Sequence, residues 1–332
     1  MRKVLTANGY KSIKLLGKGQ YGVVLKAAKA RIQDPGTTSR RPTYDIQNPI
    51  ALKVIKIREK DTVESVMAEV DMLSKLSIPK CNPFISCYYG SKEGSGYIFI
   101  EMELVDGIDL DEYMKKLRPN SNESRMLARI VAIGISTALI HVHSVGILHR
   151  DIKPANIMMT KGSVKLSEGD KGKGGEGGKG EGEGIKPTNR WDYGVPKLID
   201  FGLGCTVEDS DTKECQVVKQ PCCKGTAGTP LYQAPEVLYN STNIDKSDIW
   251  SLGVTLYQVA TGEFVWDEIN GRDIESVDRL KQVIMTDSSK VPTIPGDDKV
   301  LATVIKTCIN TNPDIRLSAR QLYHVLTDTP GQ

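Results

Sequence analysis

The sequence has no large excess of charge of one sign. Its 332 residues include 44 Lys and Arg against 41 Asp and Glu, so the formal net charge is +3. Such a balance does not by itself draw a protein to nucleic acid or to an anionic membrane surface. We therefore predict that neither nucleic acid nor a membrane is a partner, and the sequence indicates no oligomeric state.

Long apolar runs are also absent. Residues 1–14 alternate charged and polar side chains and lack the continuous apolar region of a secretory signal. The most apolar stretch, residues 130–140, is interrupted by Gly134, Ser136 and Thr137 and is too short to span a bilayer, so it predicts a buried core helix. We expect a cytoplasmic, intracellular protein, with the nucleus or, for a viral chain, the virion and the host cytoplasm as alternatives.

Cysteine follows no metal-binding pattern. The seven cysteines are an odd number, and the four between Cys205 and Cys223 lack the paired C-x₂-C spacing of zinc sites. Without a secretory signal, this distribution predicts reduced thiols. The alternative is a redox-sensitive Cys205.

Glycine, by contrast, is concentrated in one place. Nine of the 31 glycines fall within residues 169–184, and the remaining residues of this stretch are all Asp, Glu or Lys. No apolar side chain is present there whose burial could offset the entropy lost on ordering. We predict a flexible surface insertion over about residues 167–194, with a glycine-rich ligand cradle as the alternative.

The pattern of apolar residues divides the chain into a β-rich first third and an α-rich remainder. Alternation predicts strands over residues 10–19, 21–30, 49–57, 84–90 and 97–104, with a polar loop at 31–48. A helix beginning at Asp61 or Thr62 is predicted from apolar residues at a three-to-four residue period (Val66, Val70, Leu73 and Leu76). The segments "GSVKL" and "VPKLIDFG" read as a hairpin that the insertion interrupts. This organisation predicts an α+β protein of two unequal lobes joined near residues 105–107.

A glycine motif lies between the first two predicted strands. Residues 17–24, GKGQYGVV, fit the pattern G-x-G-x-x-G-x-V. Glycines let a hairpin close over phosphates with its backbone N–H groups facing them. A dinucleotide-binding unit would need a helix directly after the glycines, and a strand follows instead. An ordinary glycine-rich hairpin remains the alternative for this motif alone.

A lysine within the next apolar strand is the second motif. Burying Lys53 is costly unless it meets a carboxylate and an anionic ligand, and Glu69 on the following helix is the best-placed carboxylate. The alternative is a lysine at the strand edge that points to water.

The third motif is the sequence HRDIKPAN at residues 149–156, followed by Asp200, Phe201 and Gly202. Phosphoryl transfer needs an acceptor held in position, divalent metal on the phosphates and positive charge near the transferred group. The carboxylates, the amide and the lysines of these motifs provide a base, a metal-binding pair and that positive charge.

Together these motifs resemble the eukaryotic-type protein kinases over residues 10–326. The resemblance implies a small β-rich N-lobe over residues 10–105 and a larger α-rich C-lobe over residues 106–326. It implies that Asp151 orients the substrate hydroxyl and accepts its proton, that Lys153 neutralises the γ-phosphate, and that Lys53 holds the other phosphates of ATP. It further implies Mg²⁺, or Mn²⁺ in its place, on Asn156 and Asp200.

The same resemblance implies an ATP site formed by residues of both predicted lobes. The glycine loop would cover the phosphates, adenine would meet apolar side chains and the backbone at 103–105, and one acid would contact the ribose. The implied residues are Gly17, Lys18, Gly19, Gly22, Val24, Ala51, Lys53, Glu69, Met102, Glu103, Val105, Asp109 and Met158. For Glu236, Asp248 and Arg316, which match buried positions of the family, we favour a structural role over a catalytic one.

Individual residues of the motifs predict which hydroxyl is phosphorylated and which side chains are preferred around it in the substrate. Lys153 together with Thr229 before Pro230 is the serine/threonine pattern, so protein substrates with serine or threonine acceptors are expected. Neutral Ala155 and Gln258 predict no strong preference for arginine two residues before the acceptor, and proline direction is not expected. A pseudokinase scaffold is the alternative from another class, and a small-molecule kinase is a third.

Arg150 directly precedes the predicted base. In this family, an arginine at that position usually occurs in kinases that are activated by phosphorylation of the activation segment. The residue four before Thr229, where the phosphate is usual, is Gly225, and the nearest hydroxyl belongs to Thr226. Phosphorylation-dependent activation is therefore doubtful, and a segment ordered without phosphate is the alternative.

Overall fold

The structure is a computed structural model, and it describes residues 1–18, 22–31, 42–58, 60–162, 190–207, 222–266, 277–286, 294 and 298–328. The chain folds into two compact units, Met1–Val105 and Asp106–Gln332, here termed the N-terminal unit and the C-terminal unit. The glycine-rich stretch 169–184 and most of the predicted loop 31–48 lie outside the described residues.

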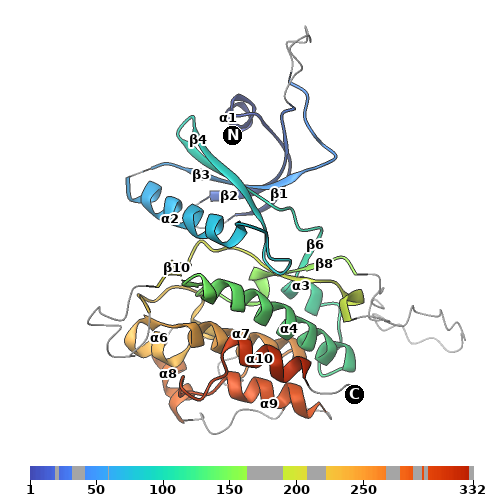
Figure 1. The fold of residues 1–332 in the computed structure, drawn as a ribbon, viewed down its shortest axis with the longest axis vertical. Helices are drawn as coiled ribbons and strands as arrows, with labels where there is room; N and C mark the ends of the chain where they lie inside the picture. The colour runs from blue at the N-terminus through green and yellow to red at the C-terminus, as the bar shows by residue number, and fades with distance from the viewer. Residues whose placement is uncertain are drawn as a thin grey trace, which may run out of the picture. The chain divides into compact units, whose positions relative to one another are not determined.

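The N-terminal unit is built on a five-stranded antiparallel sheet with the strand order β1-β2-β3-β5-β4 (Figure 1). Its strands are β1 (Tyr10–Lys18), β2 (Gly22–Lys29), β3 (Ile50–Lys56), β4 (Tyr88–Gly94) and β5 (Tyr97–Met102). Helix α2 (Lys60–Ser77) begins one or two residues before the predicted start. It buries the four apolar residues that predicted it: Val66, Val70, Leu73 and Leu76.

The register of the sheet decides which side chains share a face. Val24 lies opposite Lys53, and Ala51 lies opposite Met102. Because side chains alternate between faces along a strand, Val24, Ala51, Lys53 and Met102 all project from the same face. The predicted nucleotide-contacting residues of these strands therefore lie together.

The opposite face carries a core that the sequence pattern does not reveal. Its buried residues include Leu52, Val54 and Phe99, and a short helix α1 (Arg2–Ala7) packs Leu5 and the following Tyr10 against them. Leu5 is only 2% exposed. No element is predicted here from the sequence, and Leu5 is the one buried residue of α1.

The strand predicted over residues 84–90 is displaced in the structure. Strand β4 starts at Tyr88, whereas Phe84 lies in a turn where its backbone N–H donates to Asn82 Oδ1 at 2.9 Å. A second turn bond joins Ile85 N to Asn82 O at 3.1 Å. Asparagine favours such turns because its side chain bonds to nearby backbone, and that local preference outweighs the apolar pattern.

The C-terminal unit is mostly helical. Helix α4 packs against α7 and α10, and α7 packs against α9 (Figure 1). The helices of this unit are α3 (Leu110–Met114), α4 (Asn122–Ser144), α6 (Pro235–Asn240), α7 (Asp245–Thr261), α8 (Val277–Thr286), α9 (Lys299–Cys308) and α10 (Ala319–Thr327), with short 3₁₀ turns η1 (Pro154–Asn156), η2 (Arg190–Tyr193) and η3 (Pro230–Tyr232).

Helix α4 contains the apolar stretch at 130–140. Ser121 caps its start by accepting a hydrogen bond from Ser124 N at 3.1 Å. Among the described helices it is the one long and apolar enough to cross a membrane, yet 67% of its most apolar window is buried inside the protein. The prediction of a buried core helix is confirmed.

Short strands complete the C-terminal unit. Strand β8 (Ile157–Thr160) pairs with β6 (Gly107–Asp109) and with β9 (Pro196–Leu198). The remaining strands pair as β10 (Cys205–Thr206) with β7 (Ile147–Leu148), and as β11 (Cys223–Lys224) with β12 (Thr242–Asn243). The hairpin partner of β9 is thus residues 157–160, whereas the predicted partner 162–166 falls almost wholly outside the described residues. The predicted α+β class is confirmed.

Candidate active site

Lys53 and Glu69 form an ion pair in the N-terminal unit. Lys53 Nζ lies 2.6 Å from Glu69 Oε1 and 2.9 Å from Oε2. Their side chains are 12% and 7% exposed, so the pair is largely shielded from water. The pairing expected from the sequence is present, and the alternative of a strand-edge lysine in water is wrong.

The glycine motif spans the turn between β1 and β2. Its first part, Gly17 and Lys18, pairs with β2, whereas Gly19 lies outside the described residues. A Cβ on Gly22 would come within 2.2 Å of the carbonyl oxygen of Val54, so the close approach of β2 to β3 requires glycine there. A Cβ on Gly17 would meet nothing within 4 Å among the described atoms. Among the described residues, Gly17 therefore borders open space.

The backbone after β5 is only partly hydrogen-bonded within the protein. Glu103 N donates to Cys87 O at 2.8 Å, and Ser86 Oγ reaches Glu103 O at 3.4 Å. Within the described part of the chain, Val105 makes no backbone hydrogen bond. Its N–H and C=O therefore have no backbone partner among the described residues.

Two further predicted nucleotide residues meet in the C-terminal unit. Asp109 lies directly opposite Met158 in the β6–β8 ladder. Asp109 Oδ1 also accepts a hydrogen bond from Glu112 N at 2.8 Å and so caps α3. The carboxylate expected to contact ribose is thus fixed by the helix that it caps.

Asp151 lies at the centre of the catalytic-loop contacts and is 8% exposed. Its Oδ1 accepts hydrogen bonds from Thr229 N and Thr229 Oγ1, each at 2.9 Å. Its Oδ2 lies 2.8 Å from Asn156 Nδ2 and 2.8 Å from Lys153 Nζ. Lys153 Nζ in turn lies 2.6 Å from Thr229 Oγ1. Both residues that indicate the serine/threonine pattern therefore contact the predicted base.

The catalytic loop is anchored to helix α7 by a buried carboxylate. Asp248 is 1% exposed and accepts hydrogen bonds from the backbone N–H groups of His149 and Arg150 at 3.0 and 2.9 Å. Burial opposes its charge, but the hydrogen bond and positive potential of His143, together with His149, outweigh this and lower the pKa of Asp248. His143 is a partner that motif reasoning missed, because it lies 105 residues away in sequence.

Asn156 and Asp200 lie close through the backbone, since Ile199 N donates to Asn156 O at 3.0 Å. Asp200 adopts the left-handed conformation at φ 61°, which is costly for a residue with a side chain and indicates a position that the surroundings fix. Mg²⁺ favours one or two carboxylate or amide oxygens and completes its shell with water and phosphate. Among the described residues, no cluster of three or more His, Cys, Asp or Glu could hold a metal ion. A Mg²⁺ ion that shares its ligands with phosphate and water does not require such a cluster.

A second buried ion pair stabilises the C-terminal unit. Arg316 Nη1 and Nη2 donate to Glu236 Oε1 and Oε2, both at 2.7 Å. Arg316 is 1% exposed and Glu236 is 8% exposed. The pair is bidentate and joins the start of α6 to the segment before α10, which agrees with the structural role expected for Glu236 and Arg316.

The prediction of reduced thiols is wrong for most of the cysteines. Cys81 bonds to Cys87 and Cys205 bonds to Cys223, and Cys222 is also disulfide-bonded. In the part of the chain that the structure describes, Cys308 is free and buried, and burial raises the pKa of its thiol to about 12. The fold brings the paired Cα atoms to 5.5 and 6.5 Å, a proximity that spacing along the sequence does not reveal. The thiol argument for a cytosolic location therefore does not stand.

Comparison with known proteins identifies a family. Residues 10–326 match the protein kinase domain model. The chain is 27% identical over 318 residues to serine/threonine-protein kinase dst2 of Dictyostelium discoideum, and 26% identical over 316 residues to serine/threonine-protein kinase ppk11 of Schizosaccharomyces pombe. It is 30% identical over 251 residues to serine/threonine-protein kinase Nek5 of Mus musculus. These alignments cover 94%, 94% and 75% of this chain, but 22%, 79% and 30% of the respective relatives.

Proposed function

We propose that this chain, which belongs to the protein kinase family, transfers the γ-phosphate of ATP to serine and threonine hydroxyls of protein substrates. The family match confirms the resemblance that the motifs indicated. The observation that carries the choice of acceptor is the contact of Thr229 Oγ1 with both Asp151 and Lys153. Relatives named serine/threonine-protein kinases support it.

The residues around Asp151 suit proton transfer from a bound hydroxyl. Asp151 would accept the proton of the substrate hydroxyl, and its orientation is fixed by hydrogen bonds from Asn156 and Thr229. Lys153 would neutralise negative charge on the transferring phosphoryl group. In the N-terminal unit, Lys53, held by Glu69, would bind the remaining phosphates.

Asn156 and Asp200 would hold Mg²⁺, or Mn²⁺ in its place, because both present oxygen ligands. When bound, the metal supplies positive charge against the phosphate oxygens. Adenine would be recognised by Val24, Ala51, Met102 and Met158, with the backbone of Glu103 and Val105 supplying hydrogen bonds, and ribose by Asp109.

The substrate preference follows from neutral side chains near the acceptor site. Gln258 Oε1 accepts a hydrogen bond from Tyr232 Oη at 2.6 Å, so its amide is engaged within the protein. With Ala155 also uncharged, we expect no strong selection of arginine two residues before the acceptor. A peptide-library profile dominated by arginine at that position would contradict this.

Transfer of labelled γ-phosphate to protein substrates tests the proposal. The wild type should label serine and threonine in a Mg²⁺-dependent manner, and phosphoamino acid analysis should detect no phosphotyrosine. Asp200→Ala should abolish labelling, whereas the control Asp314→Ala, at an exposed position, should not. A wild type that binds partners but transfers no phosphate would favour the pseudokinase scaffold instead.

A further inference from the structure

The chain from Cys222 to Thr229, here termed the activation-segment end, lies beside Arg150 and has a glycine, Gly225, at the position where the phosphate is usual. Gly225 occupies the place where a phosphorylated residue is expected, and a Cβ built on it would lie 3.9 Å from Arg150 Nη2. Gly225 has φ 89°, which favours glycine. Arg150 Nε is buried and makes no hydrogen bond in the described part of the chain. Some other group must hold this segment in place.

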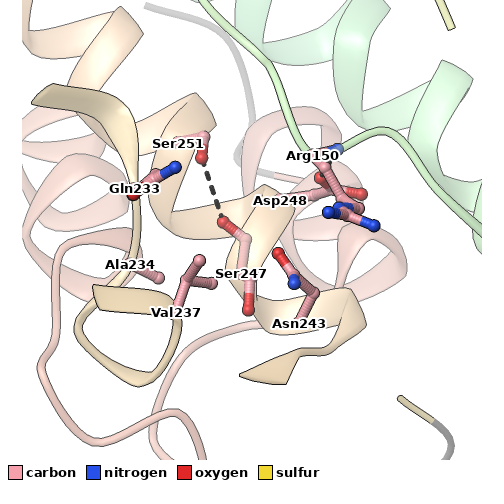
Figure 2. A pocket seen from close by; sticks show the side chains of 8 residues that line it. All are labelled: Arg150, Gln233, Ala234, Val237, Asn243, Ser247, Asp248 and Ser251. Carbon is pink, nitrogen blue, oxygen red and sulfur yellow. Dashed lines mark hydrogen bonds between the residues drawn. The ribbon is translucent and has the colours of Figure 1, made fainter. Parts of the chain in front are cut away.

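Asn243 supplies such a group. It is 2% exposed, and its side-chain Nδ2 donates to Gly225 O at 2.8 Å and to Cys223 O at 3.3 Å. Asn243 lies on β12, which pairs with β11, and Gly225 N donates to Ser241 O at 2.8 Å. Figure 2 shows Asn243 and Arg150 lining the same small pocket. A neutral amide thus binds the backbone at the position where a phosphate would otherwise act.

The contacts continue from the segment to the predicted base. Gln233 Nε2 donates to Ala227 O at 2.8 Å and more weakly to Gly228 O at 3.3 Å. A Cβ on Gly228 would come within 2.3 Å of Arg150 O, so the segment closely approaches the catalytic loop. The next residue, Thr229, bonds to Asp151. Displacement of Gly225 would therefore be transmitted over four residues to Thr229.

We propose that Asn243 is a positioning residue that holds the activation-segment end in its active arrangement without phosphorylation. The inference rests on the proposed kinase function and adds the control of the same site. Removing the amide leaves the carbonyl oxygens of Cys223 and Gly225 without their buried donor, which is costly. In kinases that require phosphorylation, charge-assisted bonds from arginine to phosphate provide the corresponding constraint.

The first test compares phosphorylated and phosphate-free protein. The full chain is treated with a serine/threonine phosphatase, its mass is measured to verify that no phosphate remains, and initial rates are recorded before autophosphorylation accumulates. We expect the rate to stay within about twofold of the protein preincubated with MgATP. Thr226→Ala, which removes the nearest exposed hydroxyl, should leave the rate unchanged. A loss of about tenfold or more in either case overturns the inference.

The second test changes Asn243 itself. Asn243→Ala and the isosteric Asn243→Asp should lower kcat/KM for a protein substrate about tenfold or more, because each removes the two donated hydrogen bonds. The KM for ATP should stay within about twofold. Asn240→Ala, an exposed asparagine at the end of α6, is the matched control and should behave as the wild type. A kcat/KM that stays within about twofold of the wild type, or a KM for ATP that rises as much as the KM for the protein substrate, would show that Asn243 does not position the segment.

Hydrogen exchange of phosphate-free protein gives a readout separate from catalysis. Amides of residues 222–229 should be protected in the wild type and exposed in Asn243→Ala, while helix α4 keeps its protection in both. Loss of protection in α4 as well would indicate general unfolding and contradict the positioning role. If the wild type transfers no phosphate in either state, both the proposed function and this inference are contradicted. If the wild type is active only after phosphorylation, the inference alone is contradicted.

Discussion

Asp151 receives hydrogen bonds or an ion pair from three neighbouring side chains, so its carboxylate is held in one orientation. Asp151→Asn keeps the size of the side chain but removes its ability to accept a proton. We predict that kcat falls by about 10² to 10⁴, the usual contribution of a general base, while ATP affinity and the melting temperature change little. Steady-state transfer assays and calorimetric ATP titration measure these quantities. Retention of more than a tenth of kcat would assign the base elsewhere.

A second residue-level prediction concerns pH. Arg129 donates two hydrogen bonds to Asp298, and Leu301 N donates a third at 2.9 Å. Burial by itself would raise the pKa of the Asp298 carboxyl, but these bonds outweigh it and lower the pKa below its ordinary value. A lowered folded-state pKa means that the ion pair stabilises the protein fully above the unfolded pKa and loses this contribution as pH falls.

Asp298→Asn isolates the charge, because asparagine caps a helix as well as aspartate does and α9 keeps its N-cap. We predict a cost of about 1 kcal/mol at pH 7, since the pair is partly exposed to solvent. The cost should shrink below about pH 4, because the Asp298 carboxyl of the unfolded chain takes up a proton there, whereas the folded-state carboxylate does so only at lower pH. Denaturant unfolding of both proteins at pH 7 and pH 3 measures it. A cost that does not change with pH would show that the charge is unimportant.

The sequence predicted those residues whose chemistry lies in short motifs. Lys53, Asp151, Asn156 and Asp200 could be singled out because they are charged and amide groups at fixed spacing in short motifs; their roles in phosphoryl transfer stay predictions. Asn243 could not, since a single buried asparagine carries no pattern. Contacts between distant residues were likewise hidden: Tyr10 Oη donates to Glu101 Oε1 at 2.7 Å, and Lys29 Nζ lies 2.6 Å from Oε2.

At the level of secondary structure, the Cys205–Cys223 disulfide joins two very short strands, β10 and β11. Each consists of two residues and has few backbone hydrogen bonds of its own. A bond that closes a loop with a sequence separation of 18 residues stabilises a protein by about 3 kcal/mol in the chain-entropy model. We predict that the Cys205→Ser, Cys223→Ser double variant loses up to about this amount, measured by denaturant unfolding without reductant.

The control for this prediction is Cys308→Ala, which removes a free buried thiol. Non-reducing peptide mapping should recover one peptide that joins Cys205 to Cys223 in the wild type and none in the double variant. Equal stability of wild type and double variant, or two free thiols in the wild type, would contradict the prediction. The disulfide could not be predicted because pairing of β10 with β7 and of β11 with β12 depends on the tertiary fold.

Boundaries of other elements show the same limit. Apolar alternation located four of the five strands of the N-terminal sheet, although β1 buries only Tyr10 and β3 and β5 bury residues on both faces. It misplaced β4, where the Asn82 turn overrides the pattern, and it gave no sign of α1, whose one buried residue is Leu5. Periodicity predicts elements that bury a regular face, and it fails where a turn or a single side chain decides.

On the scale of the whole molecule, residues 169–184 contribute nine glycines and no apolar side chain. The described strand ends on either side of this stretch already bind each other: Thr160 N donates to Val195 O at 3.0 Å, and Val195 N donates to Thr160 Oγ1 at 2.8 Å. Residues 163–168 and 185–189 would still connect them after deletion. Shortening a long loop changes its closure entropy by less than about 1 kcal/mol.

We therefore predict that deletion of residues 169–184 leaves kcat, both KM values and the melting temperature nearly unchanged. The β8–β9 ladder, and with it the position of Asn156 next to Ile199, depends on contacts that the deletion retains. Steady-state kinetics and thermal unfolding of the deleted and full-length chains test this. A fall in kcat/KM of more than about fivefold, roughly 1 kcal/mol of transition-state stabilisation, would assign the stretch a role in catalysis. A variant with the same sixteen residues in scrambled order would then show whether that role depends on sequence or on length alone.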